Sequence, residues 1–246
     1  NSTKIKIILI IPLILAVLLG IIEGSRTSIL LGLILFFSTW LSSLSFKQKS
    51  ENTDKSIFRL AFLAGGVFIL FTIFFILIQW LRQGMDTIII ALLIDRMQAY
   101  FFGYLAAFSK WFVELREFDF YSGLITLAGP FNLIGIMERP LGFYSPINIS
   151  NGISTNIFTA FRGIISDFSI SGSIIIAFII GFVFQIAFQS EKKSTLLSTL
   201  PISMFYAFTL YSPLISIFHY NSIFFSWLIL FLILIVSKNE LVDNYS

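Results

Sequence analysis

Long apolar runs recur along this chain and constrain its fold more than any other feature. A bilayer has a hydrocarbon core of about 30 Å, and a helix needs roughly 20 apolar residues to cross it, because bare backbone polar groups are costly in lipid. Six segments reach or approach this length: Ile5–Ile22, Ile29–Phe46, Ile57–Trp80, Ile170–Phe188, Leu196–Phe218 and Ile223–Val236. The sequence therefore predicts an all-α polytopic membrane protein with about six transmembrane helices and one long external loop containing short interfacial helices.

The charged residues are too few to cover a soluble protein of this size. Of the 246 residues, 12% are charged and 57% are hydrophobic, whereas a soluble domain usually has about 25% charged residues. The net charge of +3 comes from scattered basic residues, which argues against nucleic acid as a partner. With no Cys and a single His, His219, we expect neither a metal site nor a cofactor.

Lysine clusters predict the orientation of the six helices, because Lys and Arg gather on the cytoplasmic side of membrane proteins. The clusters occupy alternate connections and comprise Lys4 and Lys6, then Lys47, Lys49, Lys55 and Arg59, then Lys192 and Lys193, then Lys238. Six helices place all four clusters on one side, so residues 81–169 form a loop on the external side. We interpret residues 1–246 as a single transmembrane domain, and we expect it to be part of a longer chain because it begins with Asn1 rather than Met.

Arginine is distributed differently from lysine. In this topology eight of the nine Lys are cytoplasmic, and six of the seven Arg are external. A guanidinium binds phosphate and carboxylate as a planar fork, which an ammonium group does not offer. The distribution favours an anionic ligand on the external side, and the alternative is chance in a small sample.

Two helical segments are predicted within the external loop. Thr87–Ile94 is apolar but too short to span, so we expect it to lie in the interface or to re-enter the membrane. Gln98–Val113 has the spacing of a helix with an aromatic stripe. The stripe comprises Tyr100, Tyr104, Phe108, Trp111 and Phe112. Such a stripe is typical of a membrane interface and is also a surface on which sugar rings stack.

A competing interpretation joins Thr87–Phe112 into a seventh span, with Asp95 and Arg96 buried as a pair. That arrangement would invert the Lys pattern downstream, so we favour the single long loop. Repeated Gly and Pro between residues 123 and 152 predict irregular structure in the remainder of the loop.

The first candidate site is the junction Gly24-Ser25-Arg26-Thr27-Ser28 between the first two predicted helices. Arg26 there can extend to lipid headgroups or pair with Glu23. Alternatively it binds a phosphate or diphosphate, assisted by Ser25, by Thr27 and by the N–H groups of the first turn of the next helix.

The second candidate site is the segment Asn156–Gly172, which leads into the fourth predicted helix. Arg162 and Asp167 are five residues apart, which places them about 140° apart on one helix, so each needs another partner. Asp167 either caps the following helix or is free to accept the proton of a substrate hydroxyl. His219 is the alternative general base.

These two motifs resemble those of the Wzy-type oligosaccharide repeat unit polymerases of bacterial O-antigen and capsule synthesis. Members tend to carry Gly-Ser-Arg at an external helix junction, and Asn-x-Tyr-Thr followed by a basic residue, Asp-Phe-Gly and another Gly. This chain has Asn156-Ile157-Phe158-Thr159, Arg162, Asp167-Phe168-Ser169 and Gly172 at those positions, with Phe158 in place of Tyr and Ser169 in place of Gly. The order of helices and loops also fits, and the resemblance covers the carboxy-terminal part of a family member.

The resemblance implies a metal-independent glycosyltransferase on the outer face of the bacterial cytoplasmic membrane, which joins undecaprenyl-diphosphate-linked repeats into capsule or lipopolysaccharide O-antigen. Arg26 and Arg162 would stabilise the departing diphosphate, and Asp167 would be the favoured base. The expected substrate-binding residues are Ser25, Thr159, Arg82, Arg96, Tyr100, Tyr104 and Trp111. The expected partners are lipid-linked oligosaccharides, membrane lipid and other polysaccharide-assembly proteins. A lipid-linked oligosaccharide flippase or transporter and an O-antigen ligase are the alternatives.

The Lys pattern makes a topological prediction. Reporter fusions after Lys49 and Lys193 should behave as cytoplasmic, because both follow basic clusters. Fusions near Ser122 and Asn151 should both behave as external. Opposite behaviour of the Ser122 and Asn151 fusions would rule out a single long external loop.

Overall fold

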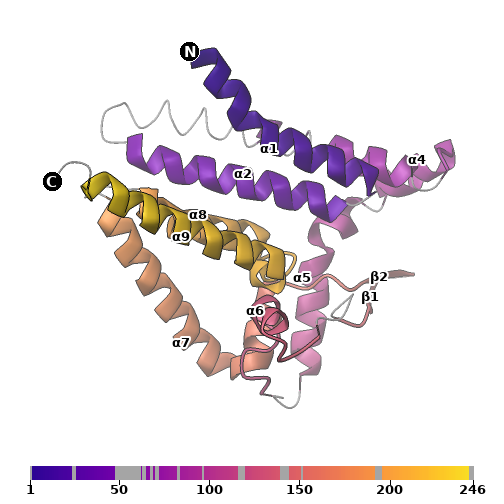
Figure 1. Cartoon of the computed structure of the whole chain (residues 1–246). Coiled ribbons are helices and arrows are strands. Elements are labelled where there is room, and N and C mark those ends of the chain that lie inside the picture. Colours follow the sequence, from indigo (N-terminus) through magenta and orange to yellow (C-terminus); the bar gives the residue numbers. More distant parts are fainter. Residues whose placement is uncertain are drawn as a thin grey trace. The chain divides into compact units, whose positions relative to one another are not determined.

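A computed structural model describes most of the chain. The described residues are 2–23, 26–47, 62, 65–66, 69, 72–81, 84–95, 97–115, 120–138, 144–150, 152–191 and 196–243. The chain divides into two compact units, Asn1–Met97 and Gln98–Ser246. Both units consist mainly of helices. The strands among the described residues form a short hairpin in the second unit (Figure 1).

The first unit contains α1 (Ser2–Ile22), α2 (Arg26–Lys47) and α4 (Thr87–Asp95). Its core comprises Ile29, Leu33 and Ile78, packed against Leu13 and Val17. The two long helices approach closely where Gly32 meets Ala16, since a Cβ on Gly32 would stand 2.5 Å from the Ala16 Cβ. The first two predicted spans are therefore confirmed as helices. The third, Ile57–Trp80, is described in part: residues 62, 65–66 and 69 are helical, and its end is helical as part of Thr72–Leu81.

The second unit begins with α5 (Met97–Glu114) and α6 (Ala128–Leu133), followed by the strands β1 (Ile147–Ser150) and β2 (Ile153–Thr155). The strands pair antiparallel in a hairpin that turns at Gly152, whose φ is 73°. The hairpin packs on α5, where Lys110 Nζ donates a hydrogen bond of 3.1 Å to the Asn148 carbonyl.

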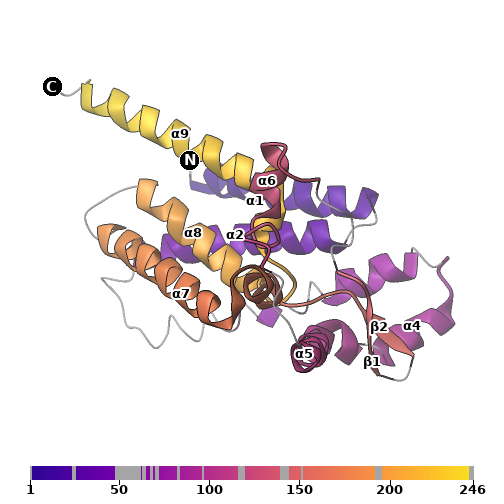
Figure 2. The ribbon, with the colours of Figure 1, turned by 90° about the horizontal axis from the view of Figure 1, so that it is seen from below.

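Three long helices complete the second unit: α7 (Ala160–Glu191), α8 (Leu196–Tyr211) and α9 (Asn221–Asp243), with the short 3₁₀ helix η1 (Ile217–His219) before α9. α8 packs against both α7 and α9, while α6 packs against η1 and α9 (Figures 1 and 2). A Cβ on Gly129 of α6 would stand 2.6 Å from the Phe218 carbonyl oxygen, so only glycine permits this approach.

The predicted helices of the loop region are present, with changes in detail. The segments expected as Thr87–Ile94 and Gln98–Val113 are helical, as α4 and α5, and Arg96 between them lies outside the described residues. The expectation of irregular structure was wrong at Gly129-Pro130, which lie in α6. Proline is tolerated there because the first turn of a helix does not need its N–H.

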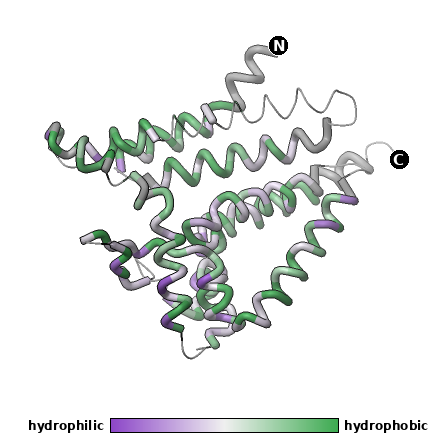
Figure 3. Tube along the Cα trace, turned by 180° about the vertical axis from the view of Figure 1, so that it is seen from behind, coloured by the Kyte–Doolittle hydropathy of each residue, from purple (hydrophilic) through white to green (hydrophobic). Residues whose placement is uncertain are grey.

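One of the described helices is long and apolar enough to cross a membrane. It is the stretch Ala160–Gln189 of α7, and none of its most apolar window is buried within the protein. Phe178 and Ile174 are 73% and 66% exposed, as expected of a helix that contacts lipid and not of one in a soluble core. Figure 3 shows that apolar residues dominate the long helices. Shorter apolar helices occupy Ile10–Ile22, Thr27–Ser43, Thr72–Leu81 and Asn221–Val236. The described residues thus contain one candidate span where the sequence predicts about six.

The fifth predicted span, Leu196–Phe218, is shorter than expected. α8 has 16 residues and ends at Tyr211, two residues before Pro213. Proline disfavours helical conformation in the residue that precedes it, so the chain turns at Ser212 and bends back through η1. The helix therefore ends just before Pro213.

α7 is two helical segments joined at Ser169. Ser169 has φ 62° and ψ 179°, a conformation that is essentially restricted to glycine. Its side chain and carbonyl start the second segment, because Ser169 Oγ accepts the Gly172 N–H at 3.4 Å and Ser173 Oγ donates to the Ser169 carbonyl at 2.5 Å. The predicted span from Ile170 therefore begins directly after a real break in the helix.

The conformation of Ser169 predicts that glycine stabilises the protein there. Ser169→Gly should raise the free energy of unfolding by about 1–2 kcal/mol, because relief of the positive φ outweighs the few tenths lost with the capping hydroxyl. The measurement is denaturant or thermal unfolding in one detergent. The control is Ser171→Gly on the exposed face of the same helix, which should lower stability by about 0.5 kcal/mol. Destabilisation by both changes would show that Ser169 is not strained.

Candidate anion-binding site at Arg162

An aromatic cage holds the guanidinium of Arg162. The Arg162 Cζ lies 3.9 Å from the ring centroid of Phe158, 4.1 Å from Tyr144 and 5.1 Å from Trp111. We call these three residues the aromatic cage. All three distances fall within the roughly 6 Å range of cation–π attraction, so the rings stabilise the charge and restrict the plane of the guanidinium.

The cage is assembled from separate parts of the second unit. Trp111 lies on α5, Tyr144 precedes the hairpin, and Phe158 directly precedes α7. Tyr144 and Phe158 are buried and meet edge to face at 5.2 Å, in a core that also contains Ala107 and Ile125. Arg162 is thereby placed in the first turn of α7 with its side chain half-buried.

Among the described residues, no acidic side chain pairs with Arg162. Within the part of the chain that the structure describes, its guanidinium forms no ion pair and no hydrogen bond. Burial raises the pKa of the Tyr144 phenol, with Arg162 opposing that shift and Asp167 adding to it, so the phenol stays neutral beside the guanidinium. A cation in the first turn of a helix is also opposed by the helix dipole. The arrangement favours binding of an anion.

Asp167 is buried and has its own partners. Only 1% of its surface is exposed. Its Oδ1 accepts the Ile125 N–H at 3.1 Å, and its Oδ2 accepts the Thr126 N–H at 2.6 Å. Asp167 thus caps the turn that precedes α6 and does not cap the helix that follows it. Because both oxygens accept backbone N–H groups, the geometry does not favour the expected role as a general base.

His219 contacts the same turn from η1. Its Nδ1 lies 3.1 Å from the Ile125 carbonyl oxygen. A carbonyl oxygen can only accept, so Nδ1 carries the proton and donates it. Asp167 and His219 therefore bind opposite ends of one peptide group, the N–H of Thr126 and the C=O of Ile125. This peptide clasp joins α7 to η1.

Two buried threonine hydroxyls lie beside the cage. Thr126 and Thr159 are 7% and 5% exposed, and their Oγ1 atoms have no hydrogen-bond partner among the described residues. Gly163, next to Arg162, packs closely against the turn that carries Thr126, since a Cβ on it would stand 3.1 Å from the Ile125 Cγ2. A Cβ there would stand 3.3 Å from the Tyr144 hydroxyl and 3.7 Å from the Thr126 Oγ1.

The structure brings together three of the predicted site residues, namely Arg162, Trp111 and Thr159. Asp167 lies further along the same helical segment and is engaged elsewhere. Arg26 begins α2 in the first unit, and its side chain is not described. Ser25, Arg82 and Arg96 lie outside the described residues, Tyr100 is described only in its α5 backbone, and Tyr104 lies half-buried on α5.

Sequence reasoning missed Tyr144, Phe158 as a cage residue, and Thr126. Phe158 stood in the quoted motif, and its position four residues before Arg162 was a usable signal. Tyr144 and Thr126 are 18 and 36 residues away from Arg162 in a segment expected to be irregular, so no local pattern indicated them.

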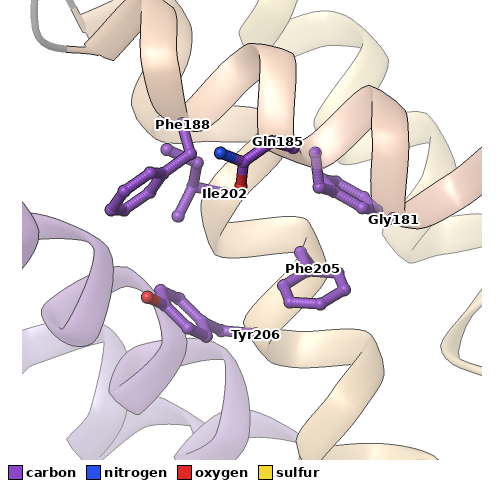
Figure 4. Close-up of a pocket in the computed structure, with 7 residues that line it drawn as sticks. Gly181, Gln185, Phe188, Ile202, Phe205 and Tyr206 are labelled. Carbon is purple, nitrogen blue, oxygen red and sulfur yellow. The ribbon is translucent and has the colours of Figure 1, made fainter.

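A separate cleft lies between α7 and α8. It has a volume of about 270 Å³ and is lined by Gly181, Phe184, Gln185, Phe188, Ile202, Phe205 and Tyr206 (Figure 4). Apart from the amide of Gln185 and the hydroxyl of Tyr206 its lining is apolar, and it contains no charged side chain. The chemistry of an anion site therefore belongs to the Arg162 region and not to this cleft.

Comparison with known proteins identifies no relative: no family model, curated protein or solved structure matches the chain. The chemical evidence on the described residues is a fixed, unpaired guanidinium beside neutral hydroxyls and aromatic rings. Such a set binds phosphate or carboxylate and presents rings to a sugar.

The two hydrogen bonds of Asp167 predict a strong effect of Asp167→Asn. The amide can accept one backbone N–H but turns its own donor toward the other, so the free energy of unfolding should fall by about 2–3 kcal/mol. Asp86→Asn is the matched control, because the carboxylate of the exposed Asp86 accepts a single hydrogen bond among the described residues, from the Ile88 N–H at 2.9 Å, which an amide oxygen also accepts. Thermal unfolding of both variants tests this, and equal, small effects would contradict the capping role.

Proposed function

We propose that this protein is a membrane glycosyltransferase that polymerises undecaprenyl-diphosphate-linked oligosaccharide repeats into O-antigen or capsule polysaccharide. It would lie in the bacterial cytoplasmic membrane with six spans and its active face outside. The observation that carries the proposal is the half-buried guanidinium of Arg162, held by three rings and without an ionic partner among the described residues. The motif resemblance and the Lys pattern support the same assignment.

In this reaction a hydroxyl of one lipid-linked repeat attacks the anomeric carbon of the growing chain. The new glycosidic bond forms, the bond from that carbon to the diphosphate oxygen breaks, and the acceptor hydroxyl releases its proton. Negative charge grows on the departing undecaprenyl diphosphate. A fixed guanidinium lowers the free energy of that charge in the transition state, because little reorganisation is needed when the charge appears.

The aromatic surroundings fit a glycan substrate. Phe108 and Phe112 stack on α5 with centroids 5.9 Å apart, and Trp111 lies between them in sequence. Phe112 is 39% exposed, so part of its ring remains accessible beside Phe108. Sugar rings bind such surfaces through their C–H faces. Trp111 itself contacts Arg162, so we propose that it positions the guanidinium and that the exposed rings contact the glycan.

Arg26 is proposed as a second diphosphate ligand. It opens α2 at the junction that resembles the family motif, and the Lys pattern places it on the same side of the membrane as Arg162. Two guanidinium groups match the charge of a diphosphate better than one.

The proposal predicts a specific defect in cells. A strain without the intact protein should still carry single repeats on its surface lipid but should lose the long-chain ladder on a polysaccharide gel. Arg162→Ala and Arg26→Ala should each reduce chain extension by about two to three decades, since one charged donor to a developing anion contributes roughly 3–4 kcal/mol. Arg→Lys should recover only part of the activity, because it keeps the charge without the planar fork.

Arg59→Ala is the control, because Arg59 belongs to a predicted cytoplasmic cluster and should leave the ladder unchanged. Loss of the single repeats as well as the ladder would indicate a flippase or an earlier transferase. Normal ladders from both alanine variants at matched protein levels would remove the diphosphate role of these arginines.

A further inference from the structure

The hydroxyl of Thr126 has no evident structural purpose. It is buried, and its Oγ1 forms no hydrogen bond with any described residue, although a buried hydroxyl normally has a partner. Valine has the same shape and would avoid the cost of desolvating this donor. The presence of a hydroxyl at this position therefore points to a partner that is not part of the fold.

The location of Thr126 indicates what that partner is. Its Oγ1 and the Tyr144 hydroxyl both face the backbone of Gly163, the residue that follows Arg162. The ring of Tyr144 is also in contact with the Arg162 guanidinium, at 4.1 Å. A group bound at Arg162 on this side would therefore meet the hydroxyl of Thr126 in addition to the cation.

The peptide clasp fixes Thr126 in place. Asp167 accepts the Thr126 N–H, and His219 donates to the carbonyl on the other end of the same peptide group. Hydrogen bonds at both ends of one amide polarise it and strengthen each other. The backbone of Thr126 is thus held from α7 and from η1, which leaves its side chain in a constant position relative to Arg162.

We propose that Thr126 is a binding residue for the anion at Arg162, in which its hydroxyl donates to a phosphoryl oxygen, and that Asp167 and His219 are positioning residues that act through the Ile125–Thr126 peptide. This inference rests on the proposed function, since it takes the diphosphate of the lipid-linked donor as the ligand. Thr159 supplies a second hydroxyl of the same kind, buried and three residues before Arg162.

The variant Thr126→Val distinguishes a role of the hydroxyl in anion binding from a role in stability. If the Thr126 hydroxyl serves only the fold, Thr126→Val lowers thermal stability and leaves the affinity of the folded protein for an anion unchanged. If it binds a phosphoryl oxygen, Thr126→Val weakens binding while thermal stability stays equal or rises. Thr126→Ser retains the hydroxyl and should retain binding.

The experiment uses the full chain in lipid nanodiscs and measures binding of farnesyl diphosphate by isothermal titration calorimetry. Inorganic pyrophosphate tests for the anion alone, and farnesol tests for the apolar tail alone. Thr126→Val should weaken farnesyl diphosphate and pyrophosphate binding by roughly ten- to a hundredfold, as expected for the loss of a hydrogen bond to a charged group. Ser203→Ala is the matched control, because the buried Ser203 hydroxyl already donates to the Leu200 carbonyl at 2.8 Å.

The outcomes are distinguishable. Weaker binding by Thr126→Val, with an unchanged or higher melting temperature and with wild-type affinity in Thr126→Ser and Ser203→Ala, supports the inference. Wild-type affinity in Thr126→Val, while Arg162→Ala loses binding, overturns the inference alone. Absence of diphosphate binding by the wild-type chain, or wild-type affinity in Arg162→Ala, overturns the diphosphate role of Arg162 and the inference with it.

Discussion

The hydrogen bonds of Asp167 to the Ile125 and Thr126 N–H groups are the interaction on which the candidate site depends. They join a helix to a turn 41 residues earlier in the chain, and the turn carries the side chains that pack beneath Tyr144 and Phe158. Charged hydrogen bonds in a buried setting are strong and directional, and leaving either N–H unpaired is costly. The first segment of α7, and Arg162 with it, is therefore held in one position relative to α5 and the aromatic cage.

Aromatic rings stabilise the half-buried positive charge of Arg162 without neutralising it, as a carboxylate would. A salt bridge would neutralise the guanidinium and occupy the N–H groups that recognise an anion. Rings attract the charge through their faces and leave the edge donors available. The phenol of Tyr144 acts in the same way, because it is neutral and lies beside the cation without reducing its positive charge.

The sequence allowed the helical class and the positions of α1, α2, α5 and the second segment of α7 to be predicted, because hydrophobic runs are local signals. The cage and the peptide clasp could not be predicted, because they join residues as far apart as Ile125 and His219 through packing alone. The role of Asp167 illustrates the same limit. Its separation from Arg162 correctly indicated that each needed another partner. The partners of Asp167 proved to be backbone N–H groups, which every residue except proline has, so the residue types could not indicate them. The end of α8 at Tyr211 shows how a proline shifts a boundary that hydrophobicity alone extends.

The break at Ser169 has a mechanical consequence. The residues before it are anchored by the clasp and the cage, whereas those after it form the exposed apolar helix. A helix in a bilayer changes its tilt when the thickness of the surrounding lipid changes. A continuous helix would carry such a change directly into the position of Arg162. In the membrane topology that we propose, the break in the helix at Ser169 separates the apolar segment from the segment that holds the guanidinium against its rings, and it is the place where a change of tilt would be absorbed.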